Sequence, residues 1–311
     1  MLPNPENIDV SVIVPAYRAS ETLGPCVESL LGQRFSGRFE VIVVVSADHE
    51  SQLPALRDDP ALTVVPRVPR LGAAAARNLG ADVARGDALA FVDADVIARD
   101  GWLAALHAAA DGDRSGAGAD LSDAVGDLCV AGAVANGTPT SVAGTVEYLV
   151  EFFDLSPSRT EPSEHGATCN LLVPRGLWET HGPFPEDMDG CEDTWLTTRA
   201  RAADRLRFAP EAVVEHLNRQ RLATVLRHQY ELGGSHARLA VFQGTVPTAP
   251  LRHGVAATVE RIRHLYRMLG HWQAPERARA RRLAPLVLAG FCAWGAGLIM
   301  ESVRIDRRAP K

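Results

Sequence analysis

The sequence predicts an α/β protein with a mostly parallel central sheet flanked by helices and with a C-terminal helical appendage. Short apolar runs alternate with amphipathic segments over the first hundred residues, and this alternation implies crossover connections and a parallel sheet. Several of the runs end in polar or acidic residues. Because right-handed crossovers place the ends of parallel strands on one sheet edge, residues that follow different strands are expected to meet there.

Short apolar runs rich in β-branched residues form the expected strands of this first half. Between the first and second expected strands, apolar residues recur at helical spacing after Ser20. We expect Ser20 to cap a helix there and Gly32 to end it. A second helix is expected over Ala73–Ala84, closed by Gly86. The four expected strands are Val10–Val14, Val41–Val45, Leu62–Val65 and Leu89–Val92.

The second half of the chain is less regular. Thr138–Pro162 shows no clear period, and Asp111–Asp127, rich in glycine, alanine and aspartate, indicates a surface loop. We expect one domain over residues 1–240, followed by a helical region over residues 241–311. The further expected elements are strands at Leu128–Val134, Ala167–Val173 and Glu211–Glu215 and helices at Arg175–Thr180, Glu192–Ala203 and Arg221–Val241.

Bulk composition narrows the functional classes. The 311 residues carry a formal net charge of -6, so nothing favours nucleic acid as a partner. The five cysteines are scattered and odd in number, which argues against a disulfide framework and indicates a reducing, cytosolic compartment. Met1–Asp9 has neither a basic nor an apolar segment, so we expect no signal peptide there.

The pair of aspartates in Asp93-Ala94-Asp95 is the strongest chemical signal. It directly follows the expected strand Leu89–Val92, and ligands bind at the carboxyl ends of strands in open α/β sheets. Two carboxylates at this position can hold a hard divalent cation, which can in turn hold a diphosphate. A solvated turn at the strand end is the structural alternative. The topology is expected to bring Tyr17, Asp48 and Gly72 to the same edge of the sheet.

Five segments, in order, resemble those of family 2 glycosyltransferases, which have the GT-A fold. The resemblance covers about residues 9–240 and implies a GT-A-like nucleotide-diphospho-sugar transferase of the inverting, non-processive type. The segments are the opening strand Val10–Tyr17, the G-x-x-x-A-R-N-x-G segment Gly72–Gly80, the approach Ala84–Asp95 to the D-x-D pair, the G-x-E-D segment Gly190–Asp193 and the histidine-bearing strand Val214–His216.

The resemblance implies a role for each polar residue of these segments. Asp95 and Asp93 would hold Mn²⁺ or Mg²⁺, and His216 would complete the coordination shell, although a lone histidine is also commonly structural. Asp193 would be the general base that removes the acceptor proton, with Glu192 orienting the site or binding the acceptor. The structural alternative is that both acids are first-turn residues favoured by a helix dipole.

The donor implied by the resemblance is a nucleotide-diphosphate sugar, with Pro15, Ala16 and Tyr17 cradling the base and ribose. Arg77 could pair with a phosphate or with Asp93. One departure concerns the second strand, where the usual first acidic position is Val45 and only Asp48 remains nearby. This departure leaves the carrier open between UDP, GDP and another nucleotide. The further donor-site candidates are Gly72, Asn78 and Asp93.

The acceptor is unidentified, and a lipid-linked or glycan hydroxyl in cell-envelope polysaccharide, glycolipid or related glycoconjugate synthesis fits the resemblance. Two other functions remain open. A nucleotidyltransferase needs a glycine-rich loop with a lysine after the first strand, and Pro15–Ser20 has neither. A degenerate binding or scaffold protein is disfavoured because Asp95, Asp193 and His216 are all present.

The tail contains an uncharged stretch, Leu283–Met300, near the lower length limit for a bilayer span. Basic residues on both sides fit a single span poorly and fit an interfacial helix on anionic lipid better, at the inner face of the plasma membrane. A helix packed on the domain is the third alternative. The basic residues are Arg277, Arg279, Arg281, Arg282, Arg304, Arg307, Arg308 and Lys311.

Overall fold

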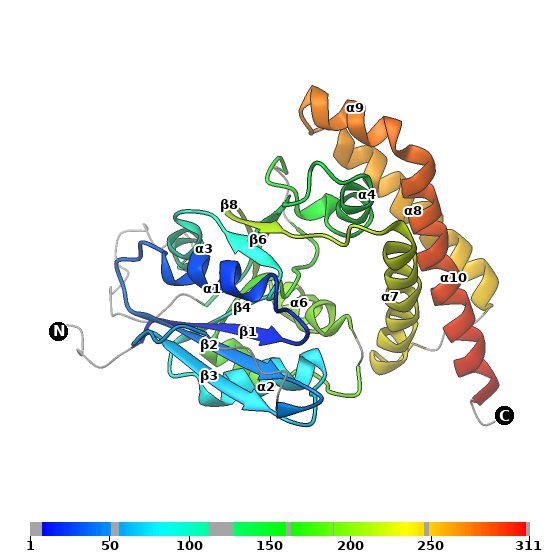
Figure 1. Cartoon of the computed structure of the whole chain (residues 1–311). Coiled ribbons are helices and arrows are strands. Elements are labelled where there is room, and N and C mark those ends of the chain that lie inside the picture. Colours follow the sequence, from blue (N-terminus) through cyan, green and yellow to red (C-terminus); the bar gives the residue numbers. More distant parts are fainter. Residues whose placement is uncertain are drawn as a thin grey trace. The chain divides into compact units, whose positions relative to one another are not determined.

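The computed structural model describes residues 8–50, 56–111, 127–159, 163–188, 190–245 and 249–308 (Figure 1). A first compact unit holds the described residues within Met1–Val134, Glu161–Asp187 and Glu192–His216. A second unit holds those within Ala135–Thr160, Met188–Cys191 and Leu217–Lys311. The division at residue 240 that the sequence suggests falls inside a helix, Leu222–Phe242, and stays a prediction.

A central sheet with strands in the order β3-β2-β1-β4-β7-β6-β8-β5 confirms the predicted fold class. Strand β1 pairs in parallel with β2 and β4, and β2 pairs in parallel with β3. Strand β7 pairs antiparallel with β4 and with β6, and β5 pairs antiparallel with β8. The strands are β1 Val10–Ala16, β2 Phe39–Ser46, β3 Leu62–Arg67, β4 Ala88–Val92, β5 Val96–Ala98, β6 Cys129–Asn136, β7 Asn170–Pro174 and β8 Leu206–His216.

Helices of the first unit pack on this sheet, α2 against β1 and β2 and α3 against β8. Their apolar residues fill a core in which the strand side chains of β1 and β4 are almost fully buried. The rings of Phe91, Trp178 and Phe184 meet with centroids 5.0–5.3 Å apart, which stabilises the end of the sheet beside β7. The helices are α1 Leu23–Leu31, α2 Ala73–Val83, α3 Trp102–Ala110, α5 Arg175–His181 and α6 Glu192–Ala202.

Asn170 joins three strands of this unit. Its side-chain amide donates to the carbonyl oxygens of Ala133 and Ala212, both at 2.8 Å, and its Oδ1 accepts from the indole of Trp102 at 2.7 Å. A Cβ on Gly132 would lie 2.2 Å from the Asn170 amide nitrogen, so the glycine leaves room for it. Because every polar atom of the buried amide has a partner, its hydrogen bonds offset the cost of desolvation while it links β6, β7 and β8.

Two boundaries expected from the sequence are wrong. Helix α1 begins at Leu23 behind Thr22 rather than behind Ser20, because a turn in which Thr22 and Leu23 donate to the Ala19 carbonyl precedes it. Helix α2 ends at Val83 with an extended residue after it, so Gly86 does not close it. Gly86 instead allows close strand contact, since a Cβ there would lie 2.5 Å from the Ser11 amide nitrogen.

The second unit is helical. Thr138–Pro162, expected to be irregular, contains helix α4 Val142–Glu151, capped by Ser141. Every residue from Ala143 to Val150 is buried, so this helix has no polar face and no periodicity that the sequence could reveal. Most of the expected Asp111–Asp127 loop lies outside the described residues. The other elements are η2 Phe153–Leu155, α7 Leu222–Phe242, α8 Pro250–Leu269, α9 Ala274–Arg282 and α10 Ala284–Arg308.

Helix α10 contains the uncharged stretch of the tail. Within the part of the chain that the structure describes, it is the one helix long and apolar enough to cross a membrane, and 44% of its most apolar window is buried in the protein. Two glycines bring it close to α7. A Cβ on Gly233 would lie 1.9 Å from the Trp294 carbonyl oxygen, and one on Gly297 would lie 1.9 Å from that of Tyr230. Backbone contact of this kind packs α10 tightly on α7.

We expect Gly233→Ala to destabilise the protein by about 2 kcal/mol, because the added methyl would overlap the Trp294 carbonyl and force the two helices apart. The matched control is Gly24→Ala in α1, where a Cβ meets no described atom within 4 Å. That substitution should leave stability unchanged or raise it by about 0.5 kcal/mol. Urea unfolding of both variants tests this. Equal stability of the two would contradict the close packing of α7 and α10.

Candidate active site

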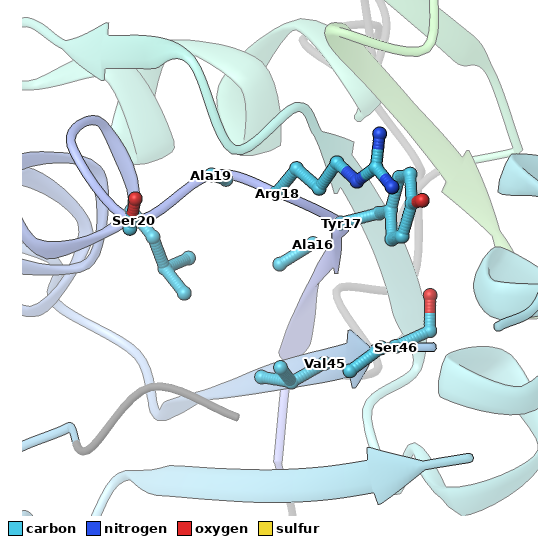
Figure 2. Close-up of a pocket in the computed structure, with 9 residues that line it drawn as sticks. Ala16, Tyr17, Arg18, Ala19, Ser20, Val45 and Ser46 are labelled. Atoms are coloured by element: carbon cyan, nitrogen blue, oxygen red, sulfur yellow. The ribbon is translucent and has the colours of Figure 1, made fainter. Parts of the chain in front are cut away.

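A cavity of about 250 Å³ opens where β1 and β2 end (Figure 2). Its wall is formed by the loop that follows β1 and by the last residues of β2. Ala16 and Tyr17, which the sequence places in a donor site, both line it, and Pro15 lies next to them in β1, paired with Val44. The lining residues are Ala16, Tyr17, Arg18, Ala19, Ser20, Leu23, Val45, Ser46 and Ala47.

Tyr17 and Asp48 lie together at this cavity. The Tyr17 hydroxyl donates to Asp48 Oδ2 at 2.9 Å, and Arg18 Nη2 lies 3.1 Å from the same oxygen. The hydrogen bond from Tyr17, followed by the charges of Arg18 and Arg70, lowers the pKa of the Asp48 carboxyl. The guanidinium carbons of Arg70 and Arg18 lie 4.5 and 5.0 Å from the centre of the Tyr17 ring. Sequence reasoning missed both arginines, although each follows a strand that ends at this edge.

Arg77 is the most buried charged group of the edge and is 4% exposed. Its Nη2 lies 2.6 Å from Asp93 Oδ1, and its Nη1 donates to Glu192 Oε1. Burial acts to lower the pKa of the guanidinium, but the charges of Asp93 and Glu192 outweigh it and raise that pKa. The sequence left two partners open for Arg77, a phosphate and Asp93. In the structure Arg77 pairs with Asp93, and it also pairs with Glu192.

Glu192 is the first residue of α6 and is 5% exposed. Burial raises the pKa of its carboxyl, the charge of Arg77 acts in the opposite direction, and that of Asp193 adds to the rise. The net pKa is raised. With its Oε1 bound to Arg77, Glu192 holds the start of α6 beside the end of β4.

Asp93, Asp95 and His216 converge in space. One ligand atom from each lies within 4.8 Å of the others, and His216 Nε2 is 3.6 Å from Asp95 Oδ1. The pairing of β5 with β8 explains this, because it sets Val96 opposite His216 and so places the histidine beside Asp95. Two carboxylates and one imidazole form a donor set that suits Mn²⁺ or Mg²⁺. The residues therefore fit the metal that the sequence predicts.

Asp193 is held at the first turn of α6 by its neighbours. Its Oδ1 accepts from the Thr194 amide at 2.6 Å and from the Thr194 hydroxyl at 3.2 Å. Its Oδ2 has a longer contact, 3.4 Å, from the Thr168 amide. Oδ1 is thus committed to orienting the side chain, and Oδ2 is the oxygen that is able to take up a proton.

Cys26, which sequence reasoning did not connect to the site, lies under the aspartate pair. Its Sγ donates to the Asp93 carbonyl oxygen at 3.4 Å. Burial, with smaller contributions from the charges of Asp95 and Asp93, raises the pKa of the thiol to about 12. The thiol therefore stays protonated and supports the Asp93 backbone instead of offering a thiolate ligand.

Two of the expected donor-site residues lie on α2. Gly72 is its N-cap, and a Cβ built there would meet no described protein atom within 4 Å. Asn78 is 7% exposed and exchanges hydrogen bonds with the Phe184 backbone, 2.9 Å each way, and donates to Glu186 at 3.2 Å. Asn78 thereby holds the turn after Gly182, and its contact with a substrate stays a prediction.

Known proteins resemble this chain in sequence and in fold. The family model of glycosyl transferase family 2 matches residues 11–124. Glycosyltransferase AglE of Haloferax volcanii is 28% identical over 234 residues, which are 72% of this chain and 71% of that protein. Pre-mycofactocin glycosyltransferase of Mycobacterium tuberculosis is 30% identical over 258 residues, 79% of this chain and 50% of that protein. These matches confirm the resemblance to glycosyl transferase family 2 that the sequence motifs predict.

The fold agrees with that resemblance. It superposes on the mannosyltransferase PcManGT from Pyrobaculum calidifontis with a TM-score of 0.58 and 20% sequence identity, over 98% of this chain and 87% of that one. This likeness shows a GT-A-like fold. The chain spans only half the length of the pre-mycofactocin glycosyltransferase that it matches.

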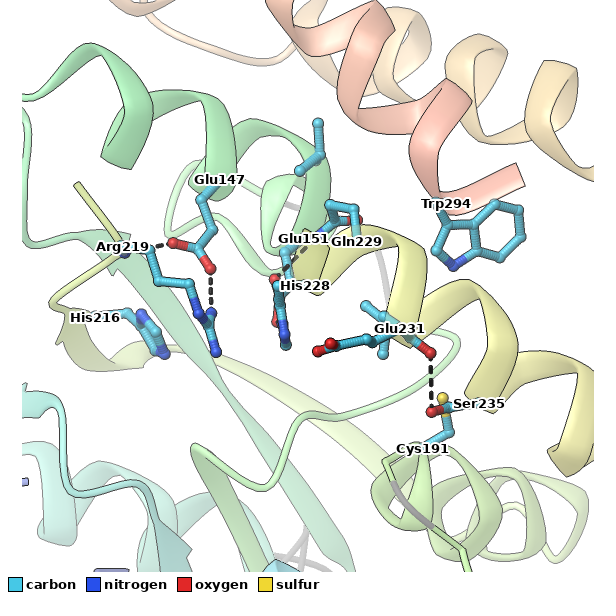
Figure 3. Close-up of polar contacts among 12 residues, drawn as sticks. Glu147, Glu151, Cys191, His216, Arg219, His228, Gln229, Glu231, Ser235 and Trp294 are labelled. Carbon is cyan, nitrogen blue, oxygen red and sulfur yellow. Dashed lines mark hydrogen bonds and ion pairs between the residues drawn. The ribbon is translucent and has the colours of Figure 1, made fainter. Parts of the chain in front are cut away.

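The second unit contains a polar network of its own, which sequence reasoning missed (Figure 3). Glu147 is fully buried and accepts from both the backbone amide and the guanidinium of Arg219. One turn further along α4, Glu151 binds His228 at 3.2 Å and Gln229 at 3.0 Å. Each carboxylate thus has a cationic partner, so the network links α4 to α7 with its charges paired.

The network predicts a pH-dependent contribution to stability. Burial acts to lower the pKa of His228, but the charge and hydrogen bond of Glu151 outweigh it, so the pKa in the folded protein is raised above 6.5. The stabilisation is therefore fully present below about pH 6.5 and is lost as the pH rises through the folded-state pKa. The stability difference between the natural protein and His228→Asn should be larger at pH 6 than at pH 9, measured by urea unfolding. The same difference at both pH values would contradict the pairing.

Proposed function

We propose that this protein is an inverting, metal-dependent glycosyltransferase that moves a sugar from a nucleotide-diphosphate sugar to an acceptor hydroxyl. The observation that carries the proposal is the arrangement around Arg77. One guanidinium binds both Asp93, which belongs to the candidate metal cluster, and Glu192, which directly precedes the candidate base Asp193. Arg77 thus holds a cation-binding group and the neighbour of the candidate proton acceptor, which suits a reaction that needs both a cation and a base.

The donor nucleotide is proposed to occupy the cavity at the ends of β1 and β2. Tyr17 offers a flat ring to a base or ribose, and Asp48 offers an ionised acceptor for N–H or O–H groups. Arg18 and Arg70 add positive charge on the side where phosphates would lie. The open space beside Gly72 at the start of α2 suits close approach of a phosphate. The GDP-Man complex of PcManGT supports a nucleotide-diphosphate donor.

Asp93, Asp95 and His216 are the proposed ligands of a divalent cation, and the Mn²⁺ in PcManGT supports this assignment. When bound, such a cation neutralises charge that develops on the leaving diphosphate. Arg77 engages only Oδ1 of Asp93 and leaves its second oxygen for the cation. His216 is 5% exposed and fixed by β8, so it would present its nitrogen with little loss of freedom.

Asp193 is the proposed general base. Its Oδ2 would accept the proton of the acceptor hydroxyl as that oxygen attacks the anomeric carbon and the bond to the diphosphate breaks. Direct displacement by one nucleophile inverts the configuration at that carbon. Thr194 and the start of α6 keep the carboxylate oriented, which reduces the entropic cost of the attack.

The acceptor is proposed to be a hydroxyl of a lipid-linked or glycan molecule in the synthesis of an envelope polysaccharide, glycolipid or related glycoconjugate. This proposal is supported by the name of a relative that acts in polysaccharide synthesis. The amylovoran biosynthesis glycosyltransferase AmsB of Erwinia amylovora is 34% identical over 96 residues, which are 29% of this chain. We place the reaction in the cytoplasm, where the scattered free cysteines stay reduced.

Asp95→Ala should remove the stimulation of nucleotide binding by Mn²⁺ while leaving the fold intact, because the residue follows a strand and its side chain is 41% exposed. Calorimetric titration of UDP and GDP, each with and without Mn²⁺, measures this and names the carrier. Asp82→Ala, an exposed aspartate of α2, is the control and should keep full stimulation. Full stimulation in Asp95→Ala as well would remove Asp95 from the site.

Asp193→Asn should bind donor normally and lose roughly two to four orders of magnitude in turnover, the range typical of a lost general base. Single-turnover transfer and donor affinity are measured together, with Asp82→Asn as the control. The anomeric configuration of the product, read by proton NMR, should be inverted. Near-normal turnover would place the base elsewhere, with Glu192 as the first candidate, and a retained configuration would overturn the proposed mechanism.

A further inference from the structure

Charge is distributed unevenly along this chain. The whole sequence carries -6, yet residues 250–308, which form α8, α9 and α10, contain eleven arginines, no lysine and four acidic residues. The C-terminal helices are therefore strongly cationic, and the rest of the chain is correspondingly acidic. Such segregation is not needed for folding, and it points to an anionic partner for these helices.

Helix α8 presents three different sides. One side packs on α10: a Cβ on Gly254 would touch Ile299, Gly295 lies against Thr258, and the Arg261 guanidinium lies 4.7 Å from the Trp294 ring centre. The next side, about 100° around the helix, is an apolar stripe exposed to solvent. The third side, beyond the stripe, is basic and exposed. The stripe is Leu251, Val255, Val259 and Tyr266, together with the half-buried Ile262. The basic side is Arg252, Arg263 and Arg267, and Glu260 beside them lies 3.9 Å from Arg263 and 2.9 Å from Arg267.

The stripe is too exposed to be a core surface. Leu251 and Tyr266 are each 67% exposed, and Val255 is 51% exposed. From Leu251 to Tyr266 the stripe runs for about 22 Å along the helix. Scattered apolar residues on a surface are ordinary, but a continuous line of this length marks a place of interaction.

Helix α10 extends the same face. Its uncharged residues Leu288, Cys292, Ala296 and Met300 are exposed and recur every fourth position. The contacts of Gly254 with Ile299 and of Thr258 with Gly295 show that α8 and α10 run antiparallel. Val255 and Val259 follow the contact residues of α8 by about 100°, and Ala296 and Met300 follow those of α10 by the same angle, so in an antiparallel pair they lie on the same side. We call these two rows together the α8–α10 face.

We propose that the α8–α10 face binds the surface of an anionic phospholipid bilayer. The two apolar rows would enter the boundary between headgroups and acyl chains, and Arg252, Arg263 and Arg267 would lie along one edge of the face, beside the lipid phosphates. This arrangement combines the two signals, apolar area and positive charge, that stable peripheral binding requires.

In this arrangement α10 stays packed and does not cross the membrane. Phe291, Trp294 and Leu298 are buried within the second unit, and Glu301 binds Arg238 of α7 at 3.5 Å. Crossing would require these contacts and the glycine contacts with α7 to break. A second copy of the chain is a poorer occupant, because a twofold contact would bring two arginine rows together, and Glu260, which lies beside them on α8, is already paired with Arg263 and Arg267.

The test is sedimentation of the full-length protein with vesicles of phosphatidylcholine, alone or mixed with phosphatidylglycerol. The natural protein should sediment with the mixed vesicles, and high salt should release it. Val255→Glu should lower the partition coefficient about tenfold, because the stripe loses an apolar anchor and gains a charge that anionic lipid repels. Val142→Glu is the matched control, a valine of α4 with 53% exposure, and should bind as the natural protein does.

The charge contribution is tested separately by Arg252→Gln with Arg263→Gln. This double variant should also bind about tenfold more weakly to the mixed vesicles. The control is Arg34→Gln with Arg207→Gln, which removes the same charge from exposed positions of the first unit and should change binding little. Nucleotide binding, measured on every variant, confirms that the fold persists, and it separates this proposal from the proposed glycosyl transfer.

Three results would overturn the proposal. Equal sedimentation of Val255→Glu and Val142→Glu would remove the stripe from the lipid contact. A dimer in lipid-free buffer that Val255→Glu dissociates, together with no vesicle binding, would make the face a contact between copies of the chain. Resistance of the cellular protein to alkaline carbonate would show a helix that crosses the membrane.

Discussion

The buried guanidinium of Arg77 is the interaction on which the candidate site depends. An unpaired charge in a protein interior costs several kcal/mol, so Arg77 must keep both Asp93 and Glu192 as partners. These two residues come from segments far apart in the chain, 16 and 115 residues away from Arg77. The requirement for charge pairing thereby connects helix α2, the end of β4 and the start of α6 into one rigid arrangement.

The mixed sheet supplies the other half of the site. The parallel strands bring Tyr17, Asp48 and Asp93 to one edge, as their common direction requires. The antiparallel pairing of β5 with β8 then adds His216, because it sets the histidine opposite Val96 and so beside Asp95. Asn170 stabilises this part of the sheet by bonding across β6, β7 and β8. A structural amide in the core thus helps to place a ligand at the edge.

In the second unit, helix α10 packs against α7 on one side and is exposed on another. The side of α10 with Gly297 and Trp294 packs on α7, and its other side is uncharged and exposed. The hydropathy of a stretch such as Leu283–Met300 therefore does not by itself distinguish a span from a packed helix. The contacts distinguish the two, because apolar area that is already buried against protein gains nothing further from contact with lipid.

Much of the site could be predicted from the sequence because its signals are local. The apolar runs that became β1, β2, β3 and β4, and the aspartates after β4, follow from alternation and from strand polarity alone. Ser20 does not cap a helix, because backbone turns compete with side-chain caps, and a single sequence does not show which will form.

The sequence by itself determined the α/β class, the edge of the sheet that carries the chemistry and the identity of the acidic residues there. Only the tertiary structure decided that Arg77 binds both Asp93 and Glu192, that α4 exists, and that Glu147 meets Arg219. The physical reason is the range of the interactions. Periodicity and strand polarity act between neighbours in the chain, whereas burial and charge pairing depend on which distant segments come together.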